Sequence, residues 1–223
     1  MSRPVEITPV LLLKAYAHGY FPMAETGDSE ELFWLDPPMR GILPLEDFHI
    51  PKRLRREIRR RRFDVRCDTD FAAVLRGCAE TTPWRPQTWI NADIYRLYSG
   101  LFAMGHAHSV ECWEGAELVG GLYGVALGAA FFGESMFSRV RDASKVALVH
   151  LVALLRQGGF TLLDTQFTTD HLARFGGHEI PQALYKAHLH EAMSRTARWQ
   201  PDRMDVAVAA LLASDAGRPP IAP

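Results

Sequence analysis

The chain has 223 residues, 48% of them hydrophobic, and its formal net charge is −1 at pH 7. These values are ordinary for a soluble globular protein with one large domain or two small ones. The near-zero net charge excludes a field that would draw the whole molecule onto nucleic acid, although local clusters of charge can still bind it.

The three cysteines, Cys67, Cys78 and Cys112, are odd in number and lack paired spacing. This pattern argues against a disulfide framework and against a zinc site. Residues 10–13 form a short apolar run, far below the roughly 20 residues of a membrane span, and there is no signal-peptide layout. We therefore expect a cytoplasmic monomer without a membrane partner.

The first predicted element is a helix that begins at Pro9, with Thr8 as its capping hydroxyl and Gly19 just past its end. The following residues, 20–38, contain too many prolines for regular structure and too many aromatic side chains for a free linker. We expect an irregular segment that packs on another part of the chain.

A basic helix is predicted next. Eight of the eleven residues in 52–62 are Lys or Arg, while Leu54 and Ile58 stand four apart. Such a run is either a solvated charged face or a phosphate-binding surface, because clustered cations repel one another unless anions lie nearby. Nucleic acid is therefore a candidate partner.

The pattern restarts after residue 62, where a strand over residues 63–67 and a short helix that begins at Asp70 indicate a domain boundary. Asn91 is expected to cap an amphipathic helix that ends before Gly105. From His106 the hydrophobic period changes to two, and two turns with glycine divide the segment to residue 135 into three antiparallel strands.

A helix capped by Ser144 is expected to end at Gly158 and Gly159, and residues 160–166 then form another strand. We predict a helical turn at residues 169–171, a loop at 175–178, and a last helix that Ile180 and Pro181 open. The segment from Trp199 resembles a frayed terminus more than a packed element.

This order of elements predicts an α+β or mixed α/β fold in which helices cover a mixed sheet, and it suits an acyltransferase sheet of the GNAT kind. We expect a small N-terminal domain with the basic helix over residues 1–62 and a GNAT-like catalytic domain over residues 63–198. Residues 199–223 are expected to form a partly flexible C-terminal tail.

Polar residues that can take part in chemistry lie in two neighbouring stretches. Glu134 stands at the end of a predicted strand. It is either a carboxylate at the edge of the sheet without a functional role or a site residue. In the next strand, alternation places Asp164 and Gln166 on one face and Leu163 and Thr165 on the other. Asp164 and Gln166 are either buried structural hydrogen-bonding groups or site residues.

A candidate pocket for an apolar ligand is formed by Leu122, Met136, Leu148 and Leu151. Core packing is the more common use of such residues. His106 and His108 lack a third ligand at fitting spacing, so no metal is expected. The chain contains no Walker loop, hydrolase elbow or dinucleotide fingerprint, and residues 139–144 lack the glycines of a coenzyme A pyrophosphate loop.

Seven motifs match a known family: HGYFPM at residues 18–23, TWI at 88–90, GHAHS at 105–109, LVGGLYGV at 118–125, GESMFS at 133–138, ASK at 143–145 and DTQ at 164–166. In these motifs the chain resembles the bacterial leucyl/phenylalanyl-tRNA-protein transferases. The resemblance covers roughly residues 8–195 and leaves the tail outside.

The resemblance implies transfer of Leu, Phe or Met from aminoacyl-tRNA to a protein N-terminus that bears Arg or Lys. The product of that transfer is a degradation signal of the N-degron pathway. It also implies a small N-terminal domain and a GNAT-like domain. No cofactor is expected, because the acyl donor is a tRNA ester and not coenzyme A.

The resemblance further implies a donor side-chain pocket lined by Leu122, Met136, Leu148, Leu151 and Leu163. Asp164 and Gln166 match the family's proposed catalytic pair. A neutral amide oxygen is too weak a base to hold a proton, so we expect Gln166 to orient the attacking amine. Asp164 would fix Gln166 and stabilise the cation formed on attack. Glu134 would bind an ammonium group of the donor or of the acceptor.

The expected contacts with tRNA follow from the same resemblance. Trp89 matches a residue that stacks on the terminal adenosine, a contact that contributes about 1–3 kcal/mol. A second family tryptophan corresponds to Trp34 or Leu35. The acceptor-stem phosphates would be bound, without reading of sequence, by Lys52, Arg53, Arg55, Arg56, Arg59 and Arg60.

Three alternatives remain open at this point. A sister transferase that acts on acidic N-termini would need cations around its acceptor site. A coenzyme A-dependent GNAT N-acyltransferase is opposed by the glycine-free loop at residues 139–144. A plain RNA-binding module would explain the basic helix and leave Asp164 and Gln166 without a role.

Overall fold

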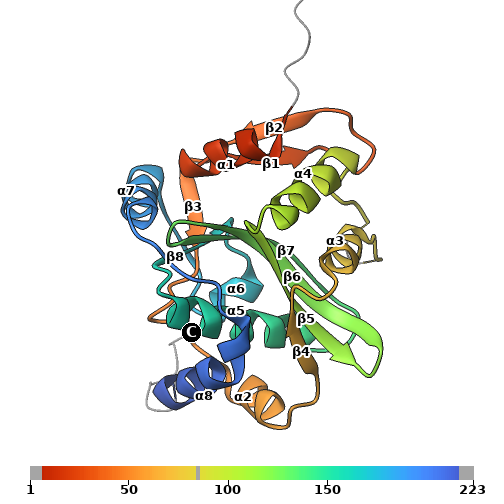
Figure 1. Cartoon of the computed structure of the whole chain (residues 1–223), viewed down its shortest axis with the longest axis vertical. Coiled ribbons are helices and arrows are strands. Elements are labelled where there is room, and N and C mark those ends of the chain that lie inside the picture. The colour runs from red at the N-terminus through yellow and green to blue at the C-terminus, as the bar shows by residue number, and fades with distance from the viewer. Residues whose placement is uncertain (1–6, 84–85, 216–223) are drawn as a thin grey trace, which may run out of the picture.

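A computed structural model describes residues 7–83 and 86–215, and its main feature is a seven-stranded sheet (Figure 1). The strand order is β4-β5-β6-β7-β8-β3-β9. The strands are β3 (Met39–Ile42), β4 (Asp64–Cys67), β5 (Ala107–Glu114), β6 (Glu117–Leu127), β7 (Ala130–Ser138), β8 (Leu162–Gln166) and β9 (His178–Pro181). Neighbouring strands are antiparallel except β7 and β8, which are parallel. The predicted mixed α/β fold is confirmed.

Helices cover both faces of this sheet and enclose two hydrophobic cores (Figure 1). One face is covered by α2 (Lys52–Arg59), α5 (Ala143–Gly158) and α8 (Met204–Asp215). The other is covered by α1 (Pro9–Ala17), α3 (Phe71–Ala79), α4 (Ala92–Ala103) and α7 (Gln182–Met193). The short elements are the pair β1 (Phe21–Ala24) and β2 (Leu32–Leu35), α6 (Asp170–Ala173) and the 3-10 turn η1 (Pro201–Arg203). In the part of the chain that is described, no helix has the length and apolarity to cross a membrane.

Several helices begin where their capping residues predict. Thr8 Oγ1 accepts a hydrogen bond from Leu11 N at 3.2 Å, and Asn91 Oδ1 accepts one from Ile94 N at 2.9 Å. The two apolar residues of α2 are buried, while most of its cations are exposed, so the basic amphipathic helix is confirmed. The three-stranded antiparallel meander β5-β6-β7 is confirmed as well.

Other segments differ from the prediction. Residues 20–38 contain a hairpin, in which Pro22 pairs with Trp34, because an edge strand can accommodate proline. Residues 178–181 form β9 and not the start of a helix, and β3 was not predicted at all. Ser144 does not cap α5, because Asp142 occupies the cap position in a left-handed conformation with no side-chain cap bond.

The parts of the chain before residue 62 and after residue 199 both contribute to the core that lies under α2, α5 and α8. β3 joins the seven-stranded sheet, and α2 packs on α5. Within the expected tail, α8 packs on α5 and buries Ala207, Val208 and Leu211, while residues 216–223 lie outside the described residues. The domain boundary near residue 62 remains a prediction.

The parallel strands β7 and β8 separate before either strand ends. Their pairing ends at Phe132 and Asp164, although β7 continues to Ser138 and β8 to Gln166. A β-bulge lies at the same place, between β6 and β7. Here Tyr123 pairs with Ser135 and Gly124 pairs with Gly133, which leaves Glu134 as the unpaired residue. Such bulges commonly redirect a side chain next to an active site.

Candidate active site

A cavity of about 900 Å³ lies where the pairing of β7 and β8 ends. Its walls are mostly apolar, with a few polar groups, which is typical of small-molecule sites. All five residues predicted for a donor side-chain pocket line it: Leu122, Met136, Leu148, Leu151 and Leu163. They belong to β6, β7, α5 and β8, so elements distant in the sequence form one apolar surface.

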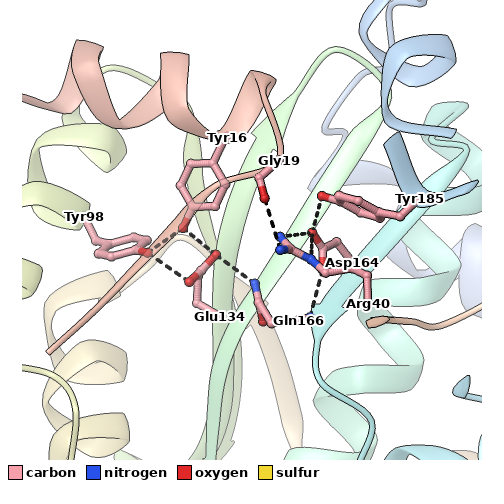
Figure 2. A network of polar contacts seen from close by, with 8 residues as sticks. All are labelled: Tyr16, Gly19, Arg40, Tyr98, Glu134, Asp164, Gln166 and Tyr185. Atoms are coloured by element: carbon pink, nitrogen blue, oxygen red, sulfur yellow. Dashed lines mark hydrogen bonds and ion pairs between the residues drawn. The ribbon is translucent and has the colours of Figure 1, made fainter. Parts of the chain in front are cut away.

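Glu134 is the one carboxylate among the described residues that line this cavity. Tyr16 Oη donates a hydrogen bond to Glu134 Oε1 at 2.7 Å, and Tyr98 Oη donates one to Oε2 at 2.9 Å (Figure 2). The two tyrosine hydroxyls also contact each other closely. Tyr16 belongs to α1 and Tyr98 to α4, so two helices on the same face of the sheet hold this carboxylate.

The environment of Glu134 changes its acidity. Burial raises the pKa of Glu134 to about 7, although the hydrogen bonds from Tyr16 and Tyr98 favour the charged form and oppose the shift. Burial also raises the pKa of both tyrosine hydroxyls well above their usual value, so they stay protonated at neutral pH. Glu134 can therefore gain and lose a proton near physiological pH.

Gln166 ends β8 with a left-handed backbone, at φ 57°, which is uncommon for a residue other than glycine. Its N–H donates a hydrogen bond to Asp164 Oδ1 at 2.8 Å. Gln166 lines the cavity together with Leu163 and Thr165, whereas Asp164 is fully buried outside the lining. The predicted alternation is therefore wrong at its last residue, because the left-handed turn redirects Gln166.

Asp164 is held by a buried cation that the sequence analysis missed. Arg40 Nε lies 3.0 Å from Asp164 Oδ1 and Nη2 lies 2.7 Å from Oδ2, while Tyr185 Oη donates to Oδ2 at 2.6 Å (Figure 2). Arg40 Nη1 also donates to the Gly19 carbonyl at 3.1 Å. Burial lowers the pKa of Arg40, but the adjacent Asp164 carboxylate outweighs burial and raises it, so the guanidinium stays charged.

The two predicted tryptophans lie in different positions. Trp89 is partly buried and lines the cavity. Trp34 is 37% exposed and stands outside the lining, on β2, although its partner Pro22 on β1 does line the cavity. Leu35, the alternative to Trp34, pairs with Phe21, another lining residue.

The six predicted phosphate-binding cations of α2 differ in their availability. Arg55 forms a hydrogen-bonded ion pair with Asp215 of α8, and Arg60 Nη1 lies 3.0 Å from Glu57 Oε1. The other four are exposed, and their side chains form no ion pair with the described residues: Lys52, Arg53, Arg56 and Arg59.

A second hollow, of about 420 Å³, lies next to α2 and shares His171 with the apolar cavity. Asp142 is the one acid among the described residues that line it, and Lys145 Nζ lies 2.6 Å from that carboxylate. The lining cations come from α2, from the loop before α5, from the first turn of α5 and from the end of α6: Arg53, Arg141, Lys145 and Arg174. No local sequence pattern indicates Arg174, because only the fold brings it beside α2.

The polar residues that support the site were also missed: Tyr16, Arg40, Tyr98 and Tyr185. One signal was available for Tyr98, since the helix that follows Asn91 presents it on its apolar face, where a buried hydroxyl needs a partner. Arg40 lies 124 residues before Asp164, and no local pattern relates the two.

His106 and His108 both contact oxygen atoms of the protein. His108 Nδ1 lies 2.9 Å from Asp68 Oδ2, and His106 Nδ1 lies 3.2 Å from the Ala126 carbonyl. Over residues 7–83 and 86–215, no group of three or more His, Cys, Asp or Glu side chains is arranged to hold a metal ion.

Comparison with known proteins matches two family models to the chain. The model described as leucyl/phenylalanyl-tRNA protein transferase matches residues 42–190, and the model of that family's N-terminal domain matches residues 5–38. A curated leucyl/phenylalanyl-tRNA–protein transferase of Paramagnetospirillum magneticum is 63% identical over 191 residues, which cover 86% of this chain and 91% of the relative. That of Nitrobacter winogradskyi is 62% identical over 188 residues, 84% of each chain.

Proposed function

The chain belongs to the leucyl/phenylalanyl-tRNA protein transferase family of aminoacyltransferases, and we propose that it transfers Leu, Phe or Met from aminoacyl-tRNA to proteins. The acceptor is the α-amino group of a protein that begins with Arg or Lys. The new peptide bond extends that N-terminus by one apolar residue and creates an N-degron.

The observation that supports this function best is the cavity itself. Its apolar wall suits an uncharged, unbranched or γ-branched donor side chain, and its polar wall, with Glu134 and Gln166, suits the amine and the ester. Trp89 lines the same cavity and offers a ring on which the terminal adenosine can stack. Binding of the donor side chain would hold the ester carbonyl at the polar wall, which lowers the entropic cost of the reaction.

In the proposed mechanism, Gln166 positions the attacking amine. Its amide orients the attacking amine, and Asp164 fixes the backbone of Gln166 through the hydrogen bond at 2.8 Å. The charge of Asp164 is already balanced by Arg40, with a closest contact of 2.7 Å. We therefore assign Asp164 the positioning role alone and no longer the stabilisation of a cation.

A basic acceptor is supported by the charge of the cavity and of the hairpin that borders it. Glu134 lines the cavity, and the loop between β1 and β2 carries four exposed acids: Glu25, Asp28, Glu30 and Glu31. β1 itself lines the cavity through Phe21 and Met23. A carboxylate in the cavity favours Arg or Lys at the acceptor terminus over Asp or Glu, because like charges repel at close range.

Binding of the tRNA backbone is proposed for the exposed cations of α2, namely Lys52, Arg53, Arg56 and Arg59, together with the hollow next to them. Arg55 and Arg60 were predicted with them and contribute less, because each already pairs with an acid. Their contacts would be with phosphates and would not depend on the nucleotide sequence.

The acceptor assignment is tested with peptides that differ only in their first residue. Wild-type protein is incubated with Leu-tRNA and with peptides that begin with Arg, Lys, Asp, Glu or Gly. We expect leucine on the α-amine of the Arg and Lys peptides, as mass spectrometry can detect, with little on the others. Preferential transfer to Asp or Glu would contradict the assignment and favour a sister transferase.

A further inference from the structure

We propose that Glu134 is the catalytic base, which takes a proton from the attacking α-amine and returns it to the departing ribose oxygen. This inference rests on the proposed function, since it assigns a proton path to that reaction. The resemblance implied only that Glu134 binds an ammonium group.

The reaction requires a group that holds a proton for a short time. The amine nitrogen attacks the ester carbonyl carbon, so a C–N bond forms and the nitrogen carries one proton too many. The C–O bond to the ribose then breaks, its electron pair goes to the ribose oxygen, and that oxygen needs one proton. A side chain that moves the proton from nitrogen to oxygen balances both steps.

The predicted catalytic pair does not provide such a group. Gln166 has a neutral amide, which cannot hold a proton at neutral pH. Asp164 is fully buried, and its two oxygens already accept hydrogen bonds from Arg40, from Tyr185 and from the Gln166 backbone. Its oxygens are therefore not free to accept a proton from an amine in the cavity.

Glu134 faces the cavity and remains able to accept a proton. The bulge leaves Glu134 unpaired opposite Gly124, and its side chain lines the cavity. Its Oε2 accepts a hydrogen bond from Tyr98 and keeps a lone pair for a further proton. The titratable and charged groups that face it come from five elements: Tyr16 of α1, Arg40 of β3, Tyr98 of α4, Tyr123 of β6 and Asp164 of β8.

The ring of Tyr16, Tyr98 and Glu134 can accommodate both protonation states of Glu134. The ring contains three close contacts, one between each pair of residues. The two hydroxyls supply only two protons, so all three contacts are hydrogen bonds only when Glu134 supplies the third. When Glu134 is ionised, both hydroxyls donate to the carboxylate and stabilise it.

The amide of Gln166 has two orientations, and the second is better satisfied. In the first, Nε2 donates to Glu134 Oε1 at 3.4 Å, but the amide oxygen then faces the carbonyl oxygens of Gly133 and Thr165 (Figure 2). In the other, Nε2 donates to the Gly133 carbonyl at 2.9 Å and to the Thr165 carbonyl at 3.0 Å, and the amide oxygen faces Glu134. That second orientation suits a protonated Glu134, because a carboxylic acid can donate to an amide oxygen.

The pKa of Glu134 suits a general base. Burial raises its pKa to about 7, while an N-terminal amine has a pKa of about 7.7–8.0. A base works best when its pKa lies near the working pH, because it is then often ionised and still binds a proton well.

The test is the pH dependence of single-turnover transfer from Leu-tRNA. The acceptor is an Arg-starting peptide whose terminal amine is replaced by an aminooxy group, so that the acceptor does not titrate between pH 6 and pH 9. The wild-type rate should rise with pH along a limb centred near pH 7. Glu134→Gln should lose this limb and about 10²–10⁴-fold in rate, the usual contribution of a general base.

Two further variants separate a base from a structural residue. Tyr98→Phe removes a hydrogen bond that lowers the pKa of Glu134, so the limb should move to higher pH without disappearing. His171→Gln removes another titratable side chain of the same cavity and should leave the limb at its wild-type pH. Because Tyr98→Phe keeps the carboxylate, it tests the inference even if Glu134→Gln fails to fold.

The outcomes distinguish this inference from the proposed function. A limb that persists in Glu134→Gln, stays unmoved in Tyr98→Phe or vanishes in His171→Gln would overturn the inference and leave the transfer reaction intact. If wild-type protein forms no product at any pH with either this peptide or its ordinary amine counterpart, the proposed function fails and the inference fails with it.

Discussion

At the scale of single residues, the site contains two carboxyl groups with opposite surroundings, one fully buried and one partly buried. Asp164 meets a guanidinium, a hydroxyl and a backbone N–H, which stabilise its charge. Glu134 meets two hydroxyls and an apolar cavity, so its charge is less well stabilised and its pKa rises to about 7. This difference separates a carboxylate whose charge is held by its partners from one that can exchange protons near neutral pH.

The raised pKa of Glu134 predicts a loss of stability with increasing pH. A carboxyl group whose pKa is higher in the folded state stabilises the fold below its unfolded pKa, and this contribution is lost as the pH rises through about 7. We compare the free energy of unfolding of Glu134→Gln with that of wild type at each pH. The difference in favour of the variant should be greater at pH 8 than at pH 5, by up to about 3 kcal/mol. Urea unfolding of both proteins at the two pH values measures it, and an equal difference at both would contradict it.

The pair of Arg40 and Asp164 predicts a different kind of loss. Arg40→Gln leaves a buried carboxylate without its cation, which should lower the free energy of unfolding by about 3–5 kcal/mol. Adding Asp164→Asn should restore part of this stability, because the unpaired charge is removed as well. Chemical denaturation of the two variants provides the comparison. If the free energy of unfolding of Arg40→Gln lies within about 0.5 kcal/mol of the wild-type value, the pair is not important for stability.

At the scale of elements, the bulge between β6 and β7 depends on Gly124. A Cβ atom there would lie 2.3 Å from the Phe132 carbonyl oxygen, which is too close for any side chain. Gly124→Ala should cost about 1–3 kcal/mol of stability and slow transfer, because relief of the clash moves the bulge that directs Glu134. Gly133→Ala, on the facing strand, is the matched control for stability, since its nearest contacts would be 3.6 and 3.8 Å away. Equal stability of the two variants would refute this explanation.

Helix α2 predicts a dependence on salt. If Arg53 and Arg56 bind phosphates, Arg53→Gln and Arg56→Gln should each weaken binding of charged tRNA and reduce the slope of log affinity against log salt by about 1. Arg195→Gln, an exposed cation at the end of α7 that pairs with Glu191, is the control and should keep the wild-type slope. Filter binding at several salt concentrations measures these slopes. If Arg53→Gln and Arg56→Gln both keep the wild-type slope, as the control does, Arg53 and Arg56 do not bind the phosphates.

Elements with strong local signals were predictable from the sequence, and elements without them were not. Thr8 and Asn91 identify their helices because each side chain caps a backbone N–H three residues on. β3 and β9 have four residues each, and they contain a charge, a glycine or a proline that is uncommon in strands. β3 can follow this path because Gly41 packs against the backbone of Phe167, where a Cβ would be 2.5 Å away.

At the scale of the whole molecule, the site forms only when distant parts of the chain meet. Tyr16 lies 118 residues before Glu134, and Arg40 lies 124 residues before Asp164 (Figure 2). The motif residues and most of the pocket residues were predictable from the family resemblance, because they belong to short motifs or to one helix face, and Leu163 directly precedes a motif. The supporting contacts were not, because they depend on the register and the packing of elements far apart in sequence.

The central claim is that the apolar cavity receives the side chain of an aminoacyl-tRNA donor. The most direct measurement is a competition in which wild-type protein, an Arg-starting peptide and equal amounts of Leu-, Phe-, Met-, Gly- and Asp-tRNA are mixed, with acetyl coenzyme A present. We predict that mass spectrometry finds Leu, Phe or Met on the peptide's α-amine, with little Gly or Asp and no acetyl group. Transfer of Asp or Gly at the same rate as Leu, or acetylation of the peptide, would contradict the account.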